Sequence, residues 1–177
     1  MIREYFFLKI LKKVNANIKI KNLRKVSGEL VGSIAVSSSK LKPIIVSKDI
    51  GKFIDELPIL FIIAALTKGV SRFNNIGDLK HKESNRLLES KKILVQAGIK
   101  CKTTKDSMII FGKDKIETQN KSILVKTKDD HRICMSSIIL SLVTGISAKI
   151  KNFETVNTSF PEFISTIKRL GGKIVIK

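Results

Sequence analysis

The sequence has few of the residues that mark disulfide-rich, zinc-binding and nucleic-acid-binding proteins. Its 177 residues include two cysteines, one tyrosine and no tryptophan. Because Cys101 and Cys134 lie far apart, without a CxxC spacing or neighbouring ligands, neither a disulfide framework nor a zinc site is expected. We therefore expect buried, reduced thiols and no metal. With so few aromatic residues and no binding motif, an RNA- or DNA-binding domain is also disfavoured.

Acidic residues are scarce as well. There are 15 of them against 34 lysines and arginines, which gives a formal net charge of +19. Such a charge is typical of proteins that bind nucleic acid or anionic membranes. Here the basic residues are mainly lysines spread over the whole sequence, which indicates a compositional bias. We expect no nucleic-acid or membrane partner, but a basic field favours a small anionic substrate. A basic nucleic-acid-binding domain without enzymatic activity remains an alternative.

Long apolar segments are absent too. The longest charge-free stretches, residues 57–67 and 133–148, are too short to cross a membrane. The first twenty residues carry charges throughout and lack the core of a signal peptide. These features predict a cytoplasmic protein. With 43% hydrophobic residues, the chain can bury a core.

A unit of about 75 residues recurs in the chain. Residues 55–69 and 130–145 each read as an acidic N-cap, a mostly apolar helix and a glycine, followed by a strand and an amphipathic helix. Residues 9–22 resemble the end of a third copy. We expect helices at 5–14, 56–69, 86–98, 131–145 and 160–172, and strands at 16–22, 33–39, 42–47, 70–76, 99–104, 107–112, 147–153 and 173–177. This alternation predicts an α/β domain with buried helices.

The segment LKHKESNRL, residues 79–87, concentrates charge at a predicted helix start. Lys82, Glu83 and Arg86 lie within about one turn, so they can hold an anionic substrate beside a group that transfers protons. Helix N-termini add free N–H donors and a positive dipole end. If the repeats pack around a pseudo-symmetry axis, Asp55 and residues 130–132 would face the same cleft. Taken alone, the segment is more simply interpreted as a solvated first turn with a Glu–Arg pair, and Asp55 as an ordinary N-cap.

Four motifs in order, IDELPIL, LKHKESNRLL, DDHRICM and NTSFPEF, resemble the enolpyruvyl transferases, and among them the 3-phosphoshikimate 1-carboxyvinyltransferase (EPSP synthase) family. The resemblance covers essentially the whole chain. It implies two domains, each of three βαβαββ units with buried helices in an inside-out, barrel-like arrangement. Residues 1–177 would be a single, partial carboxy-terminal domain, with Met1 inside its first helix. The amino-terminal domain of the same enzyme would be its partner.

The resemblance also implies a reaction. The 5-hydroxyl of shikimate 3-phosphate would add to C2 of phosphoenolpyruvate, giving a tetrahedral intermediate that loses phosphate. Asp55 would act as the base for the attacking hydroxyl. Glu83 would deliver and remove the proton at the methylene carbon of phosphoenolpyruvate, with His131 orienting Glu83. Two carboxylates in different electrostatic surroundings can divide acid and base work in this way. No cofactor is implied.

Three residues would bind substrate. By the resemblance, Lys82 contacts both substrates, while Arg86 and Arg132 hold the carboxylate of phosphoenolpyruvate through charge-assisted hydrogen bonds. The segment departs from the family pattern LRxKESDR at two positions, Lys80 and Asn85. Both residues keep polarity and hydrogen-bonding capacity.

The motifs of the family's amino-terminal domain do not occur in this sequence. That domain supplies a lysine-serine phosphate loop, a serine pair for the shikimate phosphate and a further arginine. We therefore expect the 177-residue chain to be inactive alone, because the members of one catalytic unit do not act additively. A sister transferase family acting on UDP-N-acetylglucosamine shares the fold and chemistry, but KESNR, residues 82–86, fits the shikimate branch better.

Overall fold

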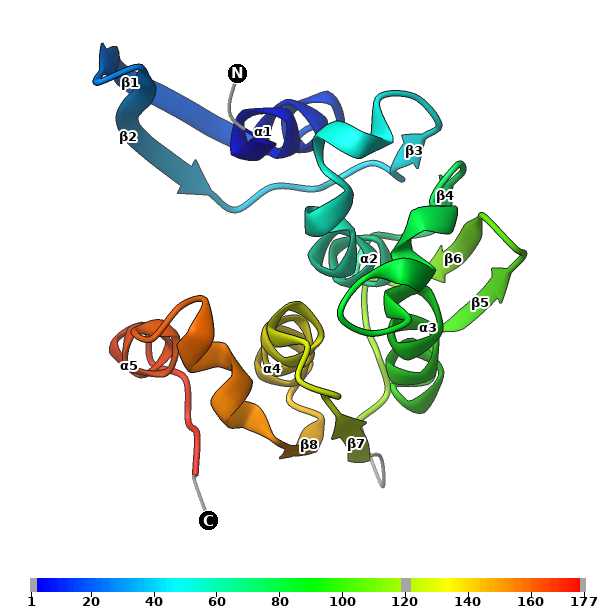
Figure 1. Cartoon of the computed structure of the whole chain (residues 1–177). Coiled ribbons are helices and arrows are strands. Elements are labelled where there is room, and N and C mark those ends of the chain that lie inside the picture. Colours follow the sequence, from blue (N-terminus) through cyan, green and yellow to red (C-terminus); the bar gives the residue numbers. More distant parts are fainter. Residues whose placement is uncertain (1–2, 119–121, 176–177) are drawn as a thin grey trace.

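The computed structural model describes residues 3–118 and 122–175 (Figure 1). Its α-helices are α1 (Arg3–Lys13), α2 (Leu57–Ala65), α3 (Arg86–Gln96), α4 (His131–Thr144) and α5 (Phe163–Arg169). Its strands are β1 (Asn17–Val26), β2 (Glu29–Ser37), β3 (Ile45–Val46), β4 (Gly69–Phe73), β5 (Lys100–Thr103), β6 (Met108–Gly112), β7 (Ser122–Lys126) and β8 (Ser147–Lys151). Short 3-10 turns lie at Ile50–Lys52, Ile54–Glu56, Gly77–His81 and Phe153–Thr158.

The elements repeat in the order expected from the sequence. β3, α2, β4, α3, β5 and β6 form a complete βαβαββ unit, whose sheet has the order β3-β4-β6-β5. In this sheet β3 and β4 are parallel, and β6 is antiparallel to both of its neighbours. The order β7, α4, β8, α5 repeats the first four elements, and β7 and β8 are again parallel. The mixed α/β fold and its repeat are therefore confirmed.

Within the described residues the strands lie in three separate sheets and form no closed barrel, which is consistent with the expected fold class. The strand expected over residues 173–177 is wrong where it can be compared. Residues 173–175 form no strand, and 176–177 lie outside the described residues. The β1–β2 hairpin is also longer than expected, because its strands are exposed along most of their length and therefore lack a regular apolar face.

The core is built around α2, which is apolar on nearly every side. Leu57, Leu60 and Phe61 are fully buried, and the ring of Phe61 meets that of Phe73 on β4 edge to face, with 4.8 Å between centroids. The end of α2 lies so close to β6 that a Cβ atom at Gly112 would overlap backbone carbonyl oxygens of the α2 end. α2 also packs against α4, so the two apolar helices of the repeats share one interior.

The β1–β2 hairpin contrasts with this core. It lies at one end of the molecule, away from β7 and β8 (Figure 1). Its exposed apolar side chains are Leu23, Val26, Leu30, Val31, Ile34 and Val36. An apolar surface of this kind commonly marks a place where another polypeptide packs.

Within the described residues, no helix combines the length and apolar character needed to cross a membrane.

Candidate active site

The starts of three helices bring the charged residues together. Asp55 lies in the 3-10 turn Ile54–Glu56 that leads into α2. Glu83 lies in the loop before α3, and Arg86 is the first residue of that helix. Arg132 is the second residue of α4. Residues far apart in the sequence thus meet at one place, as the pseudo-symmetry of the repeats predicts.

The three helices begin in different ways. Asp130 caps α4, because its carboxylate accepts hydrogen bonds from the backbone N–H groups of Arg132 and Ile133. Asn85 caps α3 by accepting from the N–H of Leu88 at 3.0 Å. The expectation that Asp55 caps α2 is wrong, because the helix starts one residue later, after the 3-10 turn, and has no side-chain cap. The carboxylate of Asp55 is thereby directed to other partners.

Arg86 lies at the centre of the cluster and is fully buried. Its Nε donates to Oδ2 of Asp130 at 2.9 Å, and its Nη1 donates to Oδ1 of Asp55 at 3.0 Å. Its Nη2 lies 2.5 Å from Oε2 of Glu83. The Glu83–Arg86 ion pair expected for a solvated first turn is thus present, but it is part of a larger network. One guanidinium joins the starts of α2, α3 and α4.

Asp55 is held between cations. The Nζ of Lys82 lies 3.0 Å from its Oδ1, which Arg86 also contacts. Burial by itself raises the pKa of Asp55, but Lys82, Arg132 and Arg86 outweigh it and hold the pKa below its ordinary value. Asp55 is therefore ionised at neutral pH and can accept a hydrogen bond from a substrate hydroxyl.

Arg132 is held from the turn before α2. Its Nη1 donates to the backbone oxygen of Asp55 at 2.8 Å and lies 3.3 Å from Oε1 of Glu56. The other oxygen of Glu56 is buried without a hydrogen-bond partner in the described part of the chain. Glu56 is not among the site residues predicted from the sequence, although it directly follows Asp55. Its pairing with Arg132, 76 residues further on, depends on how the repeats pack.

His131 borders the same cluster. Burial, followed by the nearby positive charge of Arg132, lowers the pKa of His131 below its ordinary value. The imidazole is therefore neutral at pH 7. Asp130 and Glu83 are near enough to raise its pKa in the opposite direction. Among the described residues, however, no hydrogen bond joins His131 to Glu83.

The cluster has no excess of positive charge. Its three cations face four carboxylates, which are Lys82, Arg86 and Arg132 against Asp55, Glu56, Glu83 and Asp130. An anionic substrate must therefore displace carboxylates from the arginines, or meet further cations from elsewhere. No group of histidines, cysteines and acids is arranged to hold a metal in the described parts of the chain.

A hollow of about 210 Å³ lies beside the cluster. Its polar lining residues are Asp55, Arg132 and Ser136, and the rest are apolar residues such as Ile59, Met135 and Phe163. The hollow is bordered by α2, α4 and α5, so the helices that position the charged residues also shape it. It offers room next to the carboxylate of Asp55.

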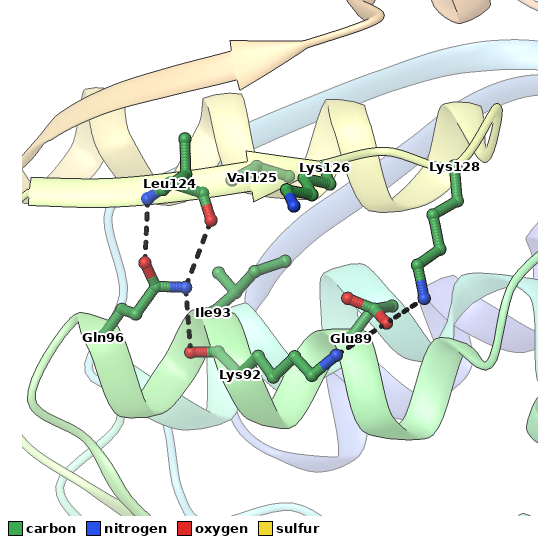
Figure 2. A pocket seen from close by; sticks show the side chains of 8 residues that line it. All are labelled: Glu89, Lys92, Ile93, Gln96, Leu124, Val125, Lys126 and Lys128. Atoms are coloured by element: carbon green, nitrogen blue, oxygen red, sulfur yellow. Dashed lines mark hydrogen bonds and ion pairs between the residues drawn. The ribbon is translucent and has the colours of Figure 1, made fainter.

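A second hollow, between α3 and β7, lies outside this cluster (Figure 2). There the side-chain amide of Gln96 accepts from the backbone N–H of Leu124 at 2.8 Å and donates to its carbonyl oxygen at 3.2 Å. Glu89 forms ion pairs with Lys92 and with Lys128, at 3.1 and 2.9 Å. None of the predicted site residues lines this hollow. Its contacts join the first repeat to the second.

Comparisons with known proteins concern the fold and the family of the chain. The fold is shared with the enolpyruvyl transferase NikO from Streptomyces tendae, at a TM-score of 0.63 and 14% identity, over 97% of this chain and 35% of that one. The fold is thus the one seen in an enolpyruvyl transferase. The family model of EPSP synthase (3-phosphoshikimate 1-carboxyvinyltransferase) matches residues 2–167. The chain belongs to this family.

Individual relatives cover nearly all of this chain but only part of their own. The 3-phosphoshikimate 1-carboxyvinyltransferase of Oceanobacillus iheyensis is 36% identical over 91% of this chain and 37% of its own length. That of Campylobacter jejuni subsp. doylei is 38% identical over 94% and 37%. A solved EPSP synthase from Acinetobacter baumannii superposes with a TM-score of 0.84 at 32% identity, over 96% and 39%. The chain therefore spans little more than a third of the relatives it matches.

Proposed function

We propose that residues 1–177 form part of a carboxy-terminal domain that supplies catalytic residues for the EPSP synthase reaction. In this reaction the enolpyruvyl group of phosphoenolpyruvate is transferred to the 5-hydroxyl of shikimate 3-phosphate, and phosphate is released, on the route to chorismate and the aromatic amino acids. The observation that carries the proposal is the convergence of Asp55, Glu83, Arg86 and Arg132 at three helix starts. Membership of the family supports it.

Asp55 is the proposed base for the attacking hydroxyl. In the structure its charge is stabilised by Lys82 and Arg86, and a carboxylate so stabilised is a weak base. If the carboxylate of phosphoenolpyruvate takes over the Nη groups of Arg86, Asp55 loses one of its cationic partners. Its pKa then rises, and it becomes a stronger base when substrate is bound. Substrate binding and proton abstraction would thus be coupled through Arg86.

Glu83 is the proposed acid and base at the methylene carbon of phosphoenolpyruvate. Its side chain is about half exposed (49%), so it can reach a substrate bound next to α3. A proton is added at that carbon when the hydroxyl attacks C2, and one is removed when phosphate leaves. In this proposal Lys82 contacts both substrates, Arg132 joins Arg86 in binding the carboxylate, and neutral His131 orients Glu83.

The amino-terminal domain of the same enzyme is the proposed partner. The cluster lacks the positive charge that two phosphorylated, carboxylated substrates require, so further cations must come from another polypeptide segment. The exposed apolar side chains of the β1–β2 hairpin offer a surface on which more of the protein can pack. The chain by itself is therefore expected to have no meaningful activity. Its cytoplasmic location remains a prediction, as does the absence of a nucleic-acid partner.

Complementation tests the proposal. The chain is mixed with a separately produced amino-terminal domain of an EPSP synthase, and phosphate release is followed with shikimate 3-phosphate and phosphoenolpyruvate. We expect turnover only in the mixture, and loss of turnover with Glu83→Gln. Turnover by the 177-residue chain alone would contradict the proposed dependence on a partner. No turnover in a mixture shown to fold and associate would contradict the proposed function.

A further inference from the structure

Asp130 is the most completely used carboxylate of the cluster. It is fully buried, and each of its oxygens accepts hydrogen bonds. Oδ1 accepts from the backbone N–H groups of Arg132 and Ile133, at 3.0 and 3.3 Å. Oδ2 accepts from Nε of Arg86 and from the hydroxyl of Ser84, both at 2.9 Å. One side chain thus caps α4 and holds the first residue of α3.

The cap alone does not require a carboxylate. Asparagine and serine cap helices about as well as aspartate. The contacts of Oδ2 are more demanding, because Ser84 and Arg86 both present donors to it. At this position an asparagine can place its oxygen toward the helix, but its NH2 group would then face two donors. A carboxylate is the side chain that satisfies both ends.

The three carboxylates around Arg86 are not equivalent. The Asp130 side chain is 0% exposed, whereas those of Asp55 and Glu83 are 13% and 49% exposed. An incoming substrate can reach and replace the exposed partners at Nη1 and Nη2. It cannot reach Asp130. Because Nε carries a single N–H, its bond to Asp130 also fixes the rotation of the guanidinium plane.

We propose that Asp130 is a positioning residue, which keeps the Nη edge of Arg86 directed at the carboxylate of phosphoenolpyruvate while Asp55 and Glu83 are displaced for proton transfer. The proposal rests on the proposed function. By capping α4, the same carboxylate also fixes the backbone that carries Arg132. Asp130 thereby aligns both of the arginines proposed to bind that carboxylate, without touching the substrate itself.

The first test concerns the chain alone. In Asp130→Asn the cap is kept and the partner of Nε is lost. NMR of the isotopically labelled chain, with the Arg86 Nε–H signal assigned through Arg86→Lys, should show hydrogen exchange at least about tenfold faster in this variant. Ser84→Ala should give a smaller increase, because it leaves the carboxylate in place. Glu89→Gln is the matched control, since Glu89 is a buried carboxylate in α3, the helix that also contains Arg86, but its ion pairs are with Lys92 and Lys128. Unchanged exchange in Asp130→Asn would overturn the proposal.

The second test uses the mixture with the amino-terminal domain. Asp130→Asn should raise KM for phosphoenolpyruvate about tenfold, with a much smaller change in KM for shikimate 3-phosphate. Glu89→Gln should leave both values near those of the wild type. Equal changes in the two KM values would reduce Asp130 to a structural role and overturn the proposal. If the wild-type mixture shows no turnover, the proposed function fails, whereas the exchange measurement still decides whether Asp130 holds Arg86.

Discussion

The starts of α2 and α4 occupy equivalent places in the two repeats, yet their acidic residues do different work. Asp130 caps α4 and is fully buried. Asp55 leaves α2 without a side-chain cap, remains partly exposed and pairs with Lys82 and Arg86. The local cause is the 3-10 turn Ile54–Glu56, which precedes α2 and has no counterpart directly before α4. A small change in how a helix begins thus separates a buried carboxylate that holds Arg86 from a partly exposed carboxylate that a substrate can reach.

Arg86 connects the two. Its guanidinium donates hydrogen bonds to both aspartates. The buried Asp130 therefore holds in place the same group that contacts Asp55. The comparison therefore predicts a gradient, in which removing the Asp130 side chain lowers stability more than removing that of Asp55, and removing the Asp55 side chain lowers turnover more. The predictions that follow test this gradient, beginning with the largest expected effect.

Replacing Arg86 should remove the link between Asp130 and Asp55. Arg86→Met leaves Asp130 buried without its cationic partner, so the free energy of unfolding should fall by about 3–5 kcal/mol. Urea unfolding followed by circular dichroism measures the loss. Lys92→Met is the control, because the Lys92 side chain is about half exposed and its partner Glu89 keeps Lys128, so the loss should be about 1 kcal/mol or less. Equal losses in the two variants would contradict the central place of Arg86.

The two aspartates should respond differently to the same substitution. Asp130→Ala removes a helix cap and the buried partner of Arg86, so we expect a loss of about 2–4 kcal/mol in unfolding free energy. Asp55→Ala removes a partly exposed carboxylate from a site rich in other acids, and we expect a loss of about 1 kcal/mol or less. Both values can be obtained from the same urea titrations. A larger loss of unfolding free energy in Asp55→Ala than in Asp130→Ala would contradict this difference between the two aspartates.

Acid should lower the free energy of unfolding by protonating the carboxylates of Asp130 and Asp55. Burial raises the pKa of Asp130, but Arg86 and Ser84 outweigh it, and the pKa lies below its ordinary value. The pKa of Asp55 is lowered as well. A lowered folded-state pKa gives stability that is fully present above the unfolded pKa of about 4 and is lost as pH falls through the folded value. Unfolding free energies measured below about pH 4 should therefore fall less steeply in Asp130→Asn than in the wild type.

The smallest effect is expected at the junction of the repeats. Gln96→Ala removes the two hydrogen bonds to the backbone of Leu124 shown in Figure 2, at an expected cost of about 1 kcal/mol. Because the junction lies outside the charged cluster, turnover in the complemented mixture should stay near the wild-type value. Differential scanning calorimetry and the phosphate assay together check this. A large loss of turnover without a loss of stability would mean that the contacts between α3 and β7 influence the geometry of the charged cluster.

The sequence predicts the repeat well, because apolar helices and acidic helix starts recur with one period. It also predicts that Asp55 and Arg132 face the same region, since they lie at equivalent helix starts of the repeat. That Glu83 and Arg86 join them is implied only by the family resemblance. The sequence does not predict the 3-10 turn before α2, which depends on a few backbone angles, and so it assigns Asp55 to the wrong local role.

Other features depend on packing between distant segments. The bonds of Asp130 to Ser84 and Arg86 span 46 and 44 residues, and no local pattern encodes them. The burial of Arg86 is likewise not predicted by the sequence, because arginine is usually exposed. The length of the β1–β2 hairpin was underestimated because exposed strands do not need alternating apolar residues.

The account is tested most directly by phosphate release from the complemented Asp55→Asn variant, measured together with its unfolding free energy. We predict that turnover falls at least about a hundredfold, because the base is lost, while the unfolding free energy stays within about 1 kcal/mol of the wild type. Turnover near the wild-type rate would show that Asp55 is not the base. A loss of stability as large as that of Asp130→Ala would show that the two aspartates do the same work, and would contradict the distinction between the two helix starts.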